Sequence, residues 1–191
     1  RPFQLNPDMP PEGMDRRAYL EAKFGGPEAA ADIYGRIAEA ARDSGLDLDF
    51  SRIARTPNTL DAHRLIRWAG VEGTQERVVS ELFRRYFEAG EDISDPAVLA
   101  ATAGRAGMDR PVVERLLAGE ADREAVAEED RAAREMGVTG VPTFLIDGRY
   151  VLQGAQDSAT WVNVIRELEA ALAERERGAE EAGPGAGVPR G

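Results

Sequence analysis

The sequence predicts an α/β protein in which a large helical block separates a short N-terminal extended segment from a C-terminal hairpin and helix. Apolar residues recur with helical spacing through most of residues 15–136, and the period changes to that of β-strands between residues 143 and 152. The chain has 191 residues, of which 42% are hydrophobic. It is therefore long enough to bury a core, either as one domain or as a small domain that carries an insertion.

The N-terminal stretch RPFQLNPDMPPEG is predicted to hold one extended piece, Pro2 to Leu5, followed by a loop broken by prolines. Two later segments place apolar residues on one helical face and predict core helices. Their apolar residues are Ala30, Ile33, Tyr34, Ile37, Ala38 and Ala41 in the first, and Val78, Val79, Leu82, Phe83, Tyr86 and Phe87 in the second. Shorter helices are predicted over 61–69, 95–106, 110–118 and 121–136, with Gly119 and Gly137 as end signals.

The C-terminal part predicts a hairpin and one helix. Thr143 to Ile146 and Arg149 to Leu152 are strand-like runs separated by Asp147-Gly148, a pair that favours a type I′ turn. Ser158 is the expected N-cap of the last helix, whose apolar stripe consists of Trp161, Val164, Ile165, Leu168 and Leu172. After Arg177 the sequence is rich in Gly and Pro and predicts a disordered tail.

Charge and composition exclude several classes of function. The net charge is −11, and the acidic balance argues against nucleic acid or an anionic membrane surface as partner. No apolar run has the length that spans a bilayer, and nothing at the start resembles a signal peptide, so a cytoplasmic location is expected. There is no cysteine, hence no disulfide, thiolate metal site or thiol nucleophile within these residues.

Two polar segments are interpreted as structural. His63 is the only histidine, and Asp61 is two positions away, where helical side chains do not face each other. A lone histidine is also a poor start for a zinc site, so no metal is predicted. The acidic run EEDRAARE, residues 128–135, has the i,i+3 and i,i+4 charge pairs of a solvated helix face.

Val141-Pro142 is the remaining candidate for function. An X-Pro bond adopts the cis form at small cost, and a proline at the first position of a strand withholds an N–H from the ladder. The backbone groups of Val141 are then available to an extended peptide or a tripeptide-like ligand. The alternative is a trans proline that ends a loop before an edge strand, and the local residues leave both open.

Longer stretches carry a family resemblance. GVTGVPTFLIDGRYVLQGAQ resembles the cis-proline loop and hairpin of the DsbA branch of the thioredoxin superfamily. RPFQLNPDMP, NTLDAHRL and YFEAGEDISD resemble FrnE-type DsbA-family oxidoreductases, and the resemblance covers roughly residues 1–172. It implies a thioredoxin-like domain from 1–14 and 137–176, an inserted helical domain at 15–136 and a tail at 178–191, with Pro2 to Leu5 as the second strand of the sheet.

The resemblance also implies a site. Pro142 would be the cis-proline, Val141 and Thr143 would contact substrate beside it, and Asn58, Thr59 and His63 would face the same cleft. The first strand and the Cys-x-x-Cys motif of the family would lie before Arg1, so we interpret the chain as a fragment. Without the attacking thiolate these residues alone are expected to be redox-inactive.

Three functions follow as hypotheses. The first is a thiol–disulfide oxidoreductase or isomerase that acts on a protein thiol or disulfide or on a small thiol, without a cofactor. The second is a glutathione-dependent enzyme of the 2-hydroxychromene-2-carboxylate isomerase or kappa transferase type, in which a serine replaces the cysteine pair and Asn58 and Thr59 contact glutathione. The third is a non-catalytic helical binding module that acts through a protein partner. The sequence determines neither the substrate nor the oligomeric state.

Overall fold

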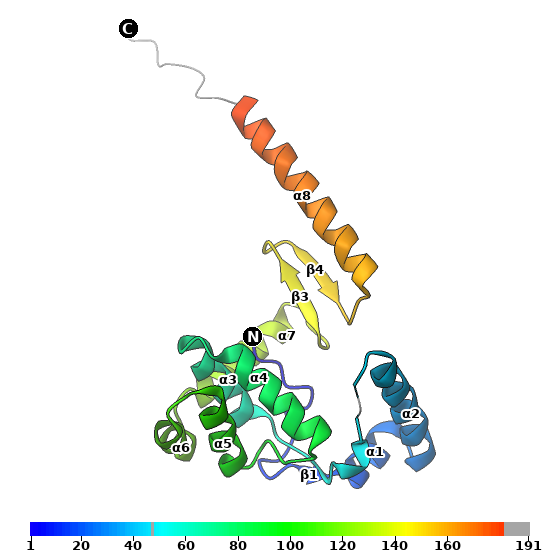
Figure 1. The fold of residues 1–191 in the computed structure, drawn as a ribbon, viewed down its shortest axis with the longest axis vertical. Coiled ribbons are helices and arrows are strands. Elements are labelled where there is room, and N and C mark those ends of the chain that lie inside the picture. The colour runs from blue at the N-terminus through cyan, green and yellow to red at the C-terminus, as the bar shows by residue number, and fades with distance from the viewer. Residues whose placement is uncertain (47, 182–191) are drawn as a thin grey trace. The chain divides into compact units, whose positions relative to one another are not determined.

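The computed structural model describes residues 1–46 and 48–181, which divide between two compact units. Residues 1–139 form the first unit, which is mostly helical (Figure 1). The second unit begins at Gly140 and holds a hairpin and a long helix. No helix among the described residues is both long and apolar enough to cross a membrane.

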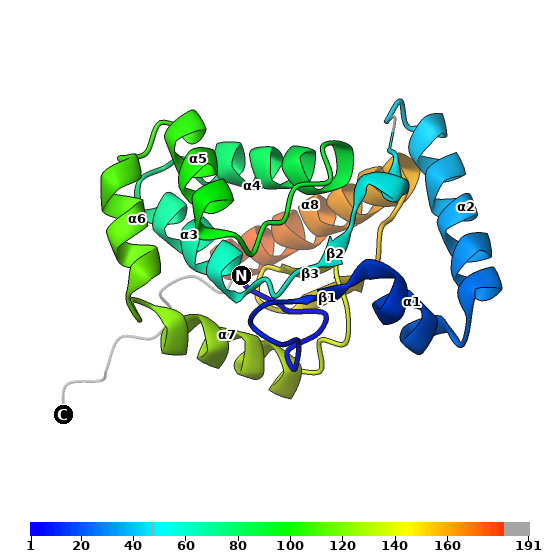
Figure 2. The same ribbon diagram turned by 90° about the horizontal axis from the view of Figure 1, so that it is seen from below.

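The first unit contains a pair of helices and a helical bundle. Its α-helices are α1 Arg16–Phe24, α2 Pro27–Asp43, α3 Leu60–Val71, α4 Gln75–Phe83, α5 Pro96–Ala106, α6 Arg110–Ala118 and α7 Arg123–Glu135. Helices α1 and α2 lie side by side, next to the bundle of α3 to α7 (Figure 2). The helices predicted over 61–69, 95–106, 110–118 and 121–136 are confirmed as α3, α5, α6 and α7.

Short elements join these helices. They are β1 Met14–Asp15, the 3₁₀ turn η1 Phe50–Arg52, β2 Arg55–Thr56 and the π-helical turn η2 Arg84–Glu88. The prediction of one continuous helix through Phe87 is therefore wrong at its end, because the chain passes from α4 into a π-turn. Strands β1 and β2 pair antiparallel, and Gly13 precedes them with φ +70°. A Cβ on Gly13 would lie 2.5 Å from the carbonyl oxygen of Thr56, so only glycine permits this approach.

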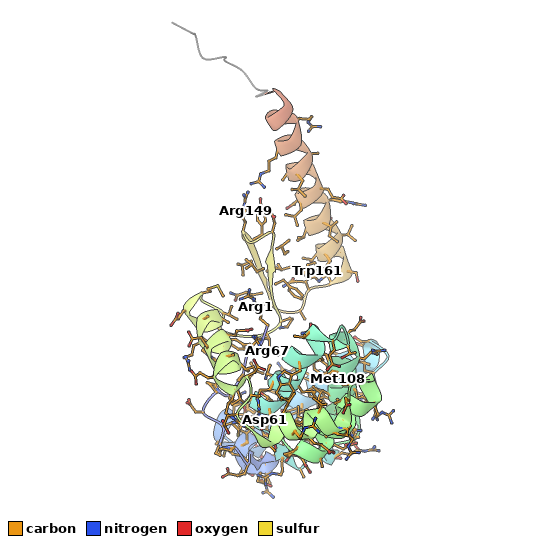
Figure 3. The ribbon with its side chains drawn as sticks, turned by 90° about the vertical axis from the view of Figure 1, so that its left-hand side faces the viewer. Arg1, Asp61, Arg67, Met108, Arg149 and Trp161 are labelled. Atoms are coloured by element: carbon orange, nitrogen blue, oxygen red, sulfur yellow. The ribbon has the colours of Figure 1, made fainter. Side chains whose placement is uncertain are left out.

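The hydrophobic core of the first unit lies among α3, α4, α5 and α6. Its fully buried side chains include Leu65, Val78, Leu99 and Val113, and Met108 closes the cluster between α5 and α6 (Figure 3). Burial of each large aliphatic side chain contributes roughly 1.5–3 kcal/mol. Helix α2 lies outside this cluster and buries less than its pattern indicates, since Ile37 is 44% exposed.

The segment Pro2 to Leu5 does not form the predicted strand. The N–H of Gln4 donates to Asp130 Oδ1 at 2.6 Å, and its carbonyl accepts a hydrogen bond from Arg134 on the same helix, α7. Side chains of α7 thus take the place of a neighbouring strand, because backbone groups must find partners when they are buried. The expectation that Asp130 lies on a solvated helix face is wrong for the same reason, since Asp130 is buried under this segment.

The second unit consists of β3 Thr143–Ile146, β4 Tyr150–Gln153 and α8 Ser158–Glu181. Asp147 and Gly148 both have positive φ, as a type I′ turn requires. Arg149 also belongs to the loop, so β4 begins one residue later than predicted, with Ile146 paired to Tyr150. The cap of α8 is Asp157 instead of Ser158, because Asp157 Oδ1 accepts from Thr160 N at 2.7 Å.

Helix α8 packs on the hairpin through its first turn. The rings of Phe144 in β3 and Trp161 in α8 meet edge to face with centroids 4.6 Å apart. Trp161 is labelled in Figure 3. The helix continues four residues beyond Arg177, where the tail is expected to begin, and the rest of that tail lies outside the described residues.

Candidate functional site

The loop that leads into β3 is shaped by one cis peptide bond and one side-chain contact. The Val141-Pro142 bond is cis, the isomer that the family resemblance implies. Thr143 Oγ1 donates to the carbonyl of Gly140 at 2.7 Å and closes the loop around the two residues between them. The carbonyl of Pro142 accepts from Gly154 N at 2.8 Å, which extends the ladder beyond the end of β4.

Val141 presents its backbone at the surface of this loop. The residue is 50% exposed. Neither its N–H nor its carbonyl has a backbone partner among the described residues of the second unit. Val141 therefore offers one donor and one acceptor in the bend that leads into β3, and such backbone groups are what an added peptide strand pairs with.

The other predicted residues lie together at the start of α3. Asn58 Nδ2 donates to the carbonyl of Met9 at 2.7 Å, and Asn58 Oδ1 accepts from Leu60 N at 2.9 Å. The same oxygen accepts from Gln4 Nε2 at 3.4 Å. The amide of Asn58 therefore joins the first turn of α3 to the N-terminal segment, and both of its polar atoms are engaged within the protein.

His63 is bonded to its own helix. The carbonyl of Thr59 accepts from His63 N at 3.0 Å and lies 2.7 Å from His63 Nδ1. A carbonyl oxygen only accepts, so Nδ1 carries the proton and Nε2 is the free acceptor of the neutral ring. Burial lowers the pKa of His63 below its usual 6.5, against the opposing effects of the Thr59 carbonyl and Asp130. The ring is therefore neutral near pH 7.

The structure also shows a buried acid that sequence reasoning placed on the surface. Asp130 accepts from Gln4 N and from Arg134 Nε, the latter at 3.0 Å. Arg134 lies over the ring of Phe3, with its guanidinium carbon 4.4 Å from the ring centroid. These contacts hold the N-terminal segment beside Asn58. No local signal marks Asp130 as buried, because Gln4, whose segment covers it, lies 126 positions away in the sequence.

The six predicted residues thus fall into two clusters, one in each unit. Val141 and Pro142 lie in the loop before β3, which begins at Thr143. Asn58 and Thr59 directly precede α3, and His63 lies in its first turn. No group of three or more His, Asp or Glu side chains suited to a metal ion occurs within residues 1–46 and 48–181. The chemistry available at the first cluster is backbone hydrogen bonding to an extended ligand.

A helical block together with a hairpin and a long C-terminal helix defines an α/β fold with a helical insertion. The family model of the DSBA-like thioredoxin domain matches residues 1–166. The chain belongs to this family, and the resemblance recognised in the sequence is confirmed at that level.

One solved structure supports the assignment of the fold. The crystal structure of a probable DsbA oxidoreductase from Streptomyces coelicolor matches with a TM-score of 0.77 and 25% sequence identity. The match covers 98% of this chain and 76% of that chain. No curated protein matches the chain.

Proposed function

We propose that this chain holds the substrate in a thiol–disulfide oxidoreductase of the DsbA type. The observation that carries the proposal is the backbone of Val141, whose N–H and carbonyl have no backbone partner within the part of the second unit that the structure describes. Family membership and the name of the solved relative, a probable DsbA oxidoreductase, support it. The substrate class is a protein or small-molecule thiol or disulfide, bound without a cofactor.

In the proposed complex an extended segment of substrate pairs with the N–H and the carbonyl of Val141. This places a substrate sulfur beside the loop for exchange. In the exchange step a thiolate attacks one sulfur of a disulfide, a new S–S bond forms, and the second sulfur leaves as a thiolate. These 191 residues contain no cysteine, so the attacking thiolate comes from outside them.

Asn58, Thr59 and His63 receive a supporting role in this proposal. The amide of Asn58 and the carbonyl of Thr59 already bond within the protein, which leaves them little capacity for a ligand such as glutathione. We therefore assign them to positioning the start of α3, and we do not advance the glutathione-dependent alternative. A cytoplasmic location and the narrower FrnE-type assignment belong to the same proposal, and cell fractionation tests the first of these.

A binding experiment tests the role of Val141. The probe is an unstructured six-residue peptide with a central cysteine, and the control is the same peptide N-methylated at that cysteine. We expect N-methylation to weaken binding about fivefold to tenfold, because one backbone hydrogen bond is lost. The variant Val141→Ala keeps both backbone groups and retains most of the affinity. Equal binding of the two peptides would contradict the proposal.

A second experiment tests the chemistry. The coding sequence before Arg1 is read, and the native protein is assayed for reduction of a peptide disulfide. A Cys-x-x-Cys motif whose substitution by serine abolishes the activity supports the proposal. A serine in place of the motif, together with glutathione binding, would favour the glutathione-dependent enzyme. A native protein with neither the motif nor glutathione binding would favour the non-catalytic module.

A further inference from the structure

Arg16, the first residue of α1, is a half-buried cation whose side chain contacts neutral hydroxyl groups. Nη1 donates to Thr56 Oγ1 and to the hydroxyl of Tyr86, both at 3.2 Å, and Nη2 donates to the hydroxyl of Tyr34. The neighbouring Arg17 pairs with Glu21. Arg16 has no carboxylate partner among the residues that the structure describes.

The positive charge of Arg16 therefore has no bonded counter-ion among the described residues, and some of its N–H donors have no acceptor there. A guanidinium has five N–H donors, and the three hydroxyls engage three of them, so two remain for a ligand. Burial raises the pKa of Tyr86, which keeps that residue a neutral hydroxyl and not a counter-ion for Arg16. A partly desolvated charge without a counter-ion is unfavourable, and a bound anion would relieve it.

Arg16 lines a pocket of about 470 Å³. That volume lies in the range of small-molecule sites, roughly 300–1,000 Å³. The apolar side chains of the lining come from α1, α2 and the segment around η1, and they are Leu20, Ala30, Ala31, Tyr34, Phe50, Ile53 and Ala54. The rings of Tyr34 and Phe50 meet edge to face at 5.0 Å. The pocket therefore combines an apolar wall with one cationic group.

The π-helical turn η2 contacts two of the lining residues, Arg16 and Phe50, although none of its own residues lines the pocket. It carries Tyr86, whose hydroxyl accepts from Arg16, and Phe87, whose ring lies 6.5 Å from that of Phe50. Turns of π-helix are rare and occur frequently at functional sites. Its contacts with Arg16 and Phe50 place this rare turn next to the pocket.

The charges of the lining favour a ligand with a single negative charge. Asp15, Glu21 and Arg17 also line the pocket. Asp15 accepts from Ala18 N as the cap of α1, and Glu21 is paired with Arg17. The four charges of the lining sum to zero, and Arg16 is the cation that no carboxylate contacts among the described residues. A ligand with one negative charge therefore meets less repulsion from Asp15 and Glu21 than a dianionic phosphate would.

We propose that this pocket binds a small monocarboxylic acid with an apolar body. The carboxylate bonds to the remaining donors of Arg16, and the body lies against Leu20, Tyr34 and Phe50. The lining includes none of the six residues assigned to substrate binding in thiol–disulfide exchange. The site is therefore additional to the proposed function, and each can fail without the other.

The test compares two ligands that differ in charge. They are 4-phenylbutyrate and its neutral analogue 4-phenylbutan-1-ol, titrated into the 191-residue chain by calorimetry at pH 7. We expect the carboxylate to bind about tenfold more tightly or better, because charge-assisted hydrogen bonds are the stronger ones. Equal or tighter binding of the alcohol, or no binding of either ligand at millimolar concentration, would overturn the proposal.

Three variants locate the effect. Arg16→Met removes the preference for the carboxylate, whereas Arg17→Met retains it, because Arg17 is 82% exposed and already paired. Ala31→Leu narrows the pocket from an exposed position and weakens both ligands. If Arg16→Met fails to fold, two measurements still test the site. They are the comparison of the two ligands on the unaltered chain and the binding of both ligands to Ala31→Leu. Loss of the preference in Arg17→Met, or unchanged binding in Ala31→Leu, would contradict the site.

Discussion

Arg64 shows how one residue organises the helical bundle. Its side chain has no exposed surface, and its guanidinium donates to the carbonyls of Ala121, Leu116 and Gly119 at 2.6–2.7 Å. It also pairs with Asp61 at 2.9 Å. A single side chain from α3 thereby bonds to carbonyl groups at the end of α6 and in the loop before α7. The Leu116 carbonyl also accepts from Gly119 N at 3.3 Å.

Arg64→Met is expected to lower the free energy of unfolding by about 3 kcal/mol or more, because it removes a fully buried guanidinium that donates to three part-buried carbonyls and pairs with Asp61. The control is Arg67→Met on the same helix. Arg67 is 40% exposed and pairs with Asp122 and Glu129 at the surface, so its loss should cost less than about 1 kcal/mol (Figure 3 shows the side chain). Urea denaturation at pH 7 measures the free energy of unfolding of both variants. Similar decreases in the two variants would show that Arg64 is not the organising residue.

At the scale of elements, Glu81 joins α4, the π-turn and α5. Its carboxylate bonds to Arg84 Nε at 2.8 Å, Arg85 Nε at 2.9 Å and Arg105 Nε at 2.9 Å. The Glu81 side chain is only 11% exposed. The hydrogen bonds from Arg84 are the largest cause that lowers the pKa of Glu81 from 4.5 to about 2.

The lowered pKa gives a prediction with a defined sign. A carboxyl group whose pKa is lower in the folded state stabilises the fold above its unfolded pKa and loses this contribution as the pH falls through the folded pKa. The difference in stability between the unaltered chain and Glu81→Gln should be largest near pH 7 and shrink between about pH 4.5 and 2. Urea denaturation across this range measures it, with Glu76→Gln as an exposed control on α4. A difference that does not change with pH would refute the assignment.

At the scale of the whole molecule, burial is distributed unevenly between the two units. The first unit contains the buried cluster of α3 to α6. In the second, no residue is buried among those between 140 and 181 whose side chains the structure describes, and Leu145 and Val151 are 60% and 58% exposed. A two-stranded hairpin with one helix on it gains little stability from its own contacts.

Hydrogen exchange should reflect this difference. Backbone amides of α3 and α5 are expected to exchange only through global unfolding, whereas those of β3, β4 and α8 exchange faster through local opening. Mass spectrometry of peptic peptides measures the exchange rates of these elements. Helix α1 is the control, because it belongs to the first unit but contains no buried residue. Equal protection of α5 and the hairpin would mean that the second unit is stabilised by more than its own contacts.

Local patterns in the sequence determined most elements of this protein. The spacing of apolar residues predicts α3, α5, α6 and α7, and Asp147-Gly148 predicts the hairpin turn, because both signals act over a few residues. The candidate loop was also found from the sequence. The residues around Val141 and Pro142 left the isomer open, and the family resemblance implied the cis form that the structure shows.

Only the tertiary structure decided what happens where distant segments meet. Gln4 and Asp130 are 126 positions apart, and their contact turns an expected strand into a segment held by side chains and an expected surface acid into a buried one. Arg16 has the sequence context of an ordinary helix start, and Thr56, Tyr34 and Tyr86 make it a half-buried cation in a pocket. The physical reason is that the burial and charge state of a polar side chain depend on neighbours that no local pattern specifies.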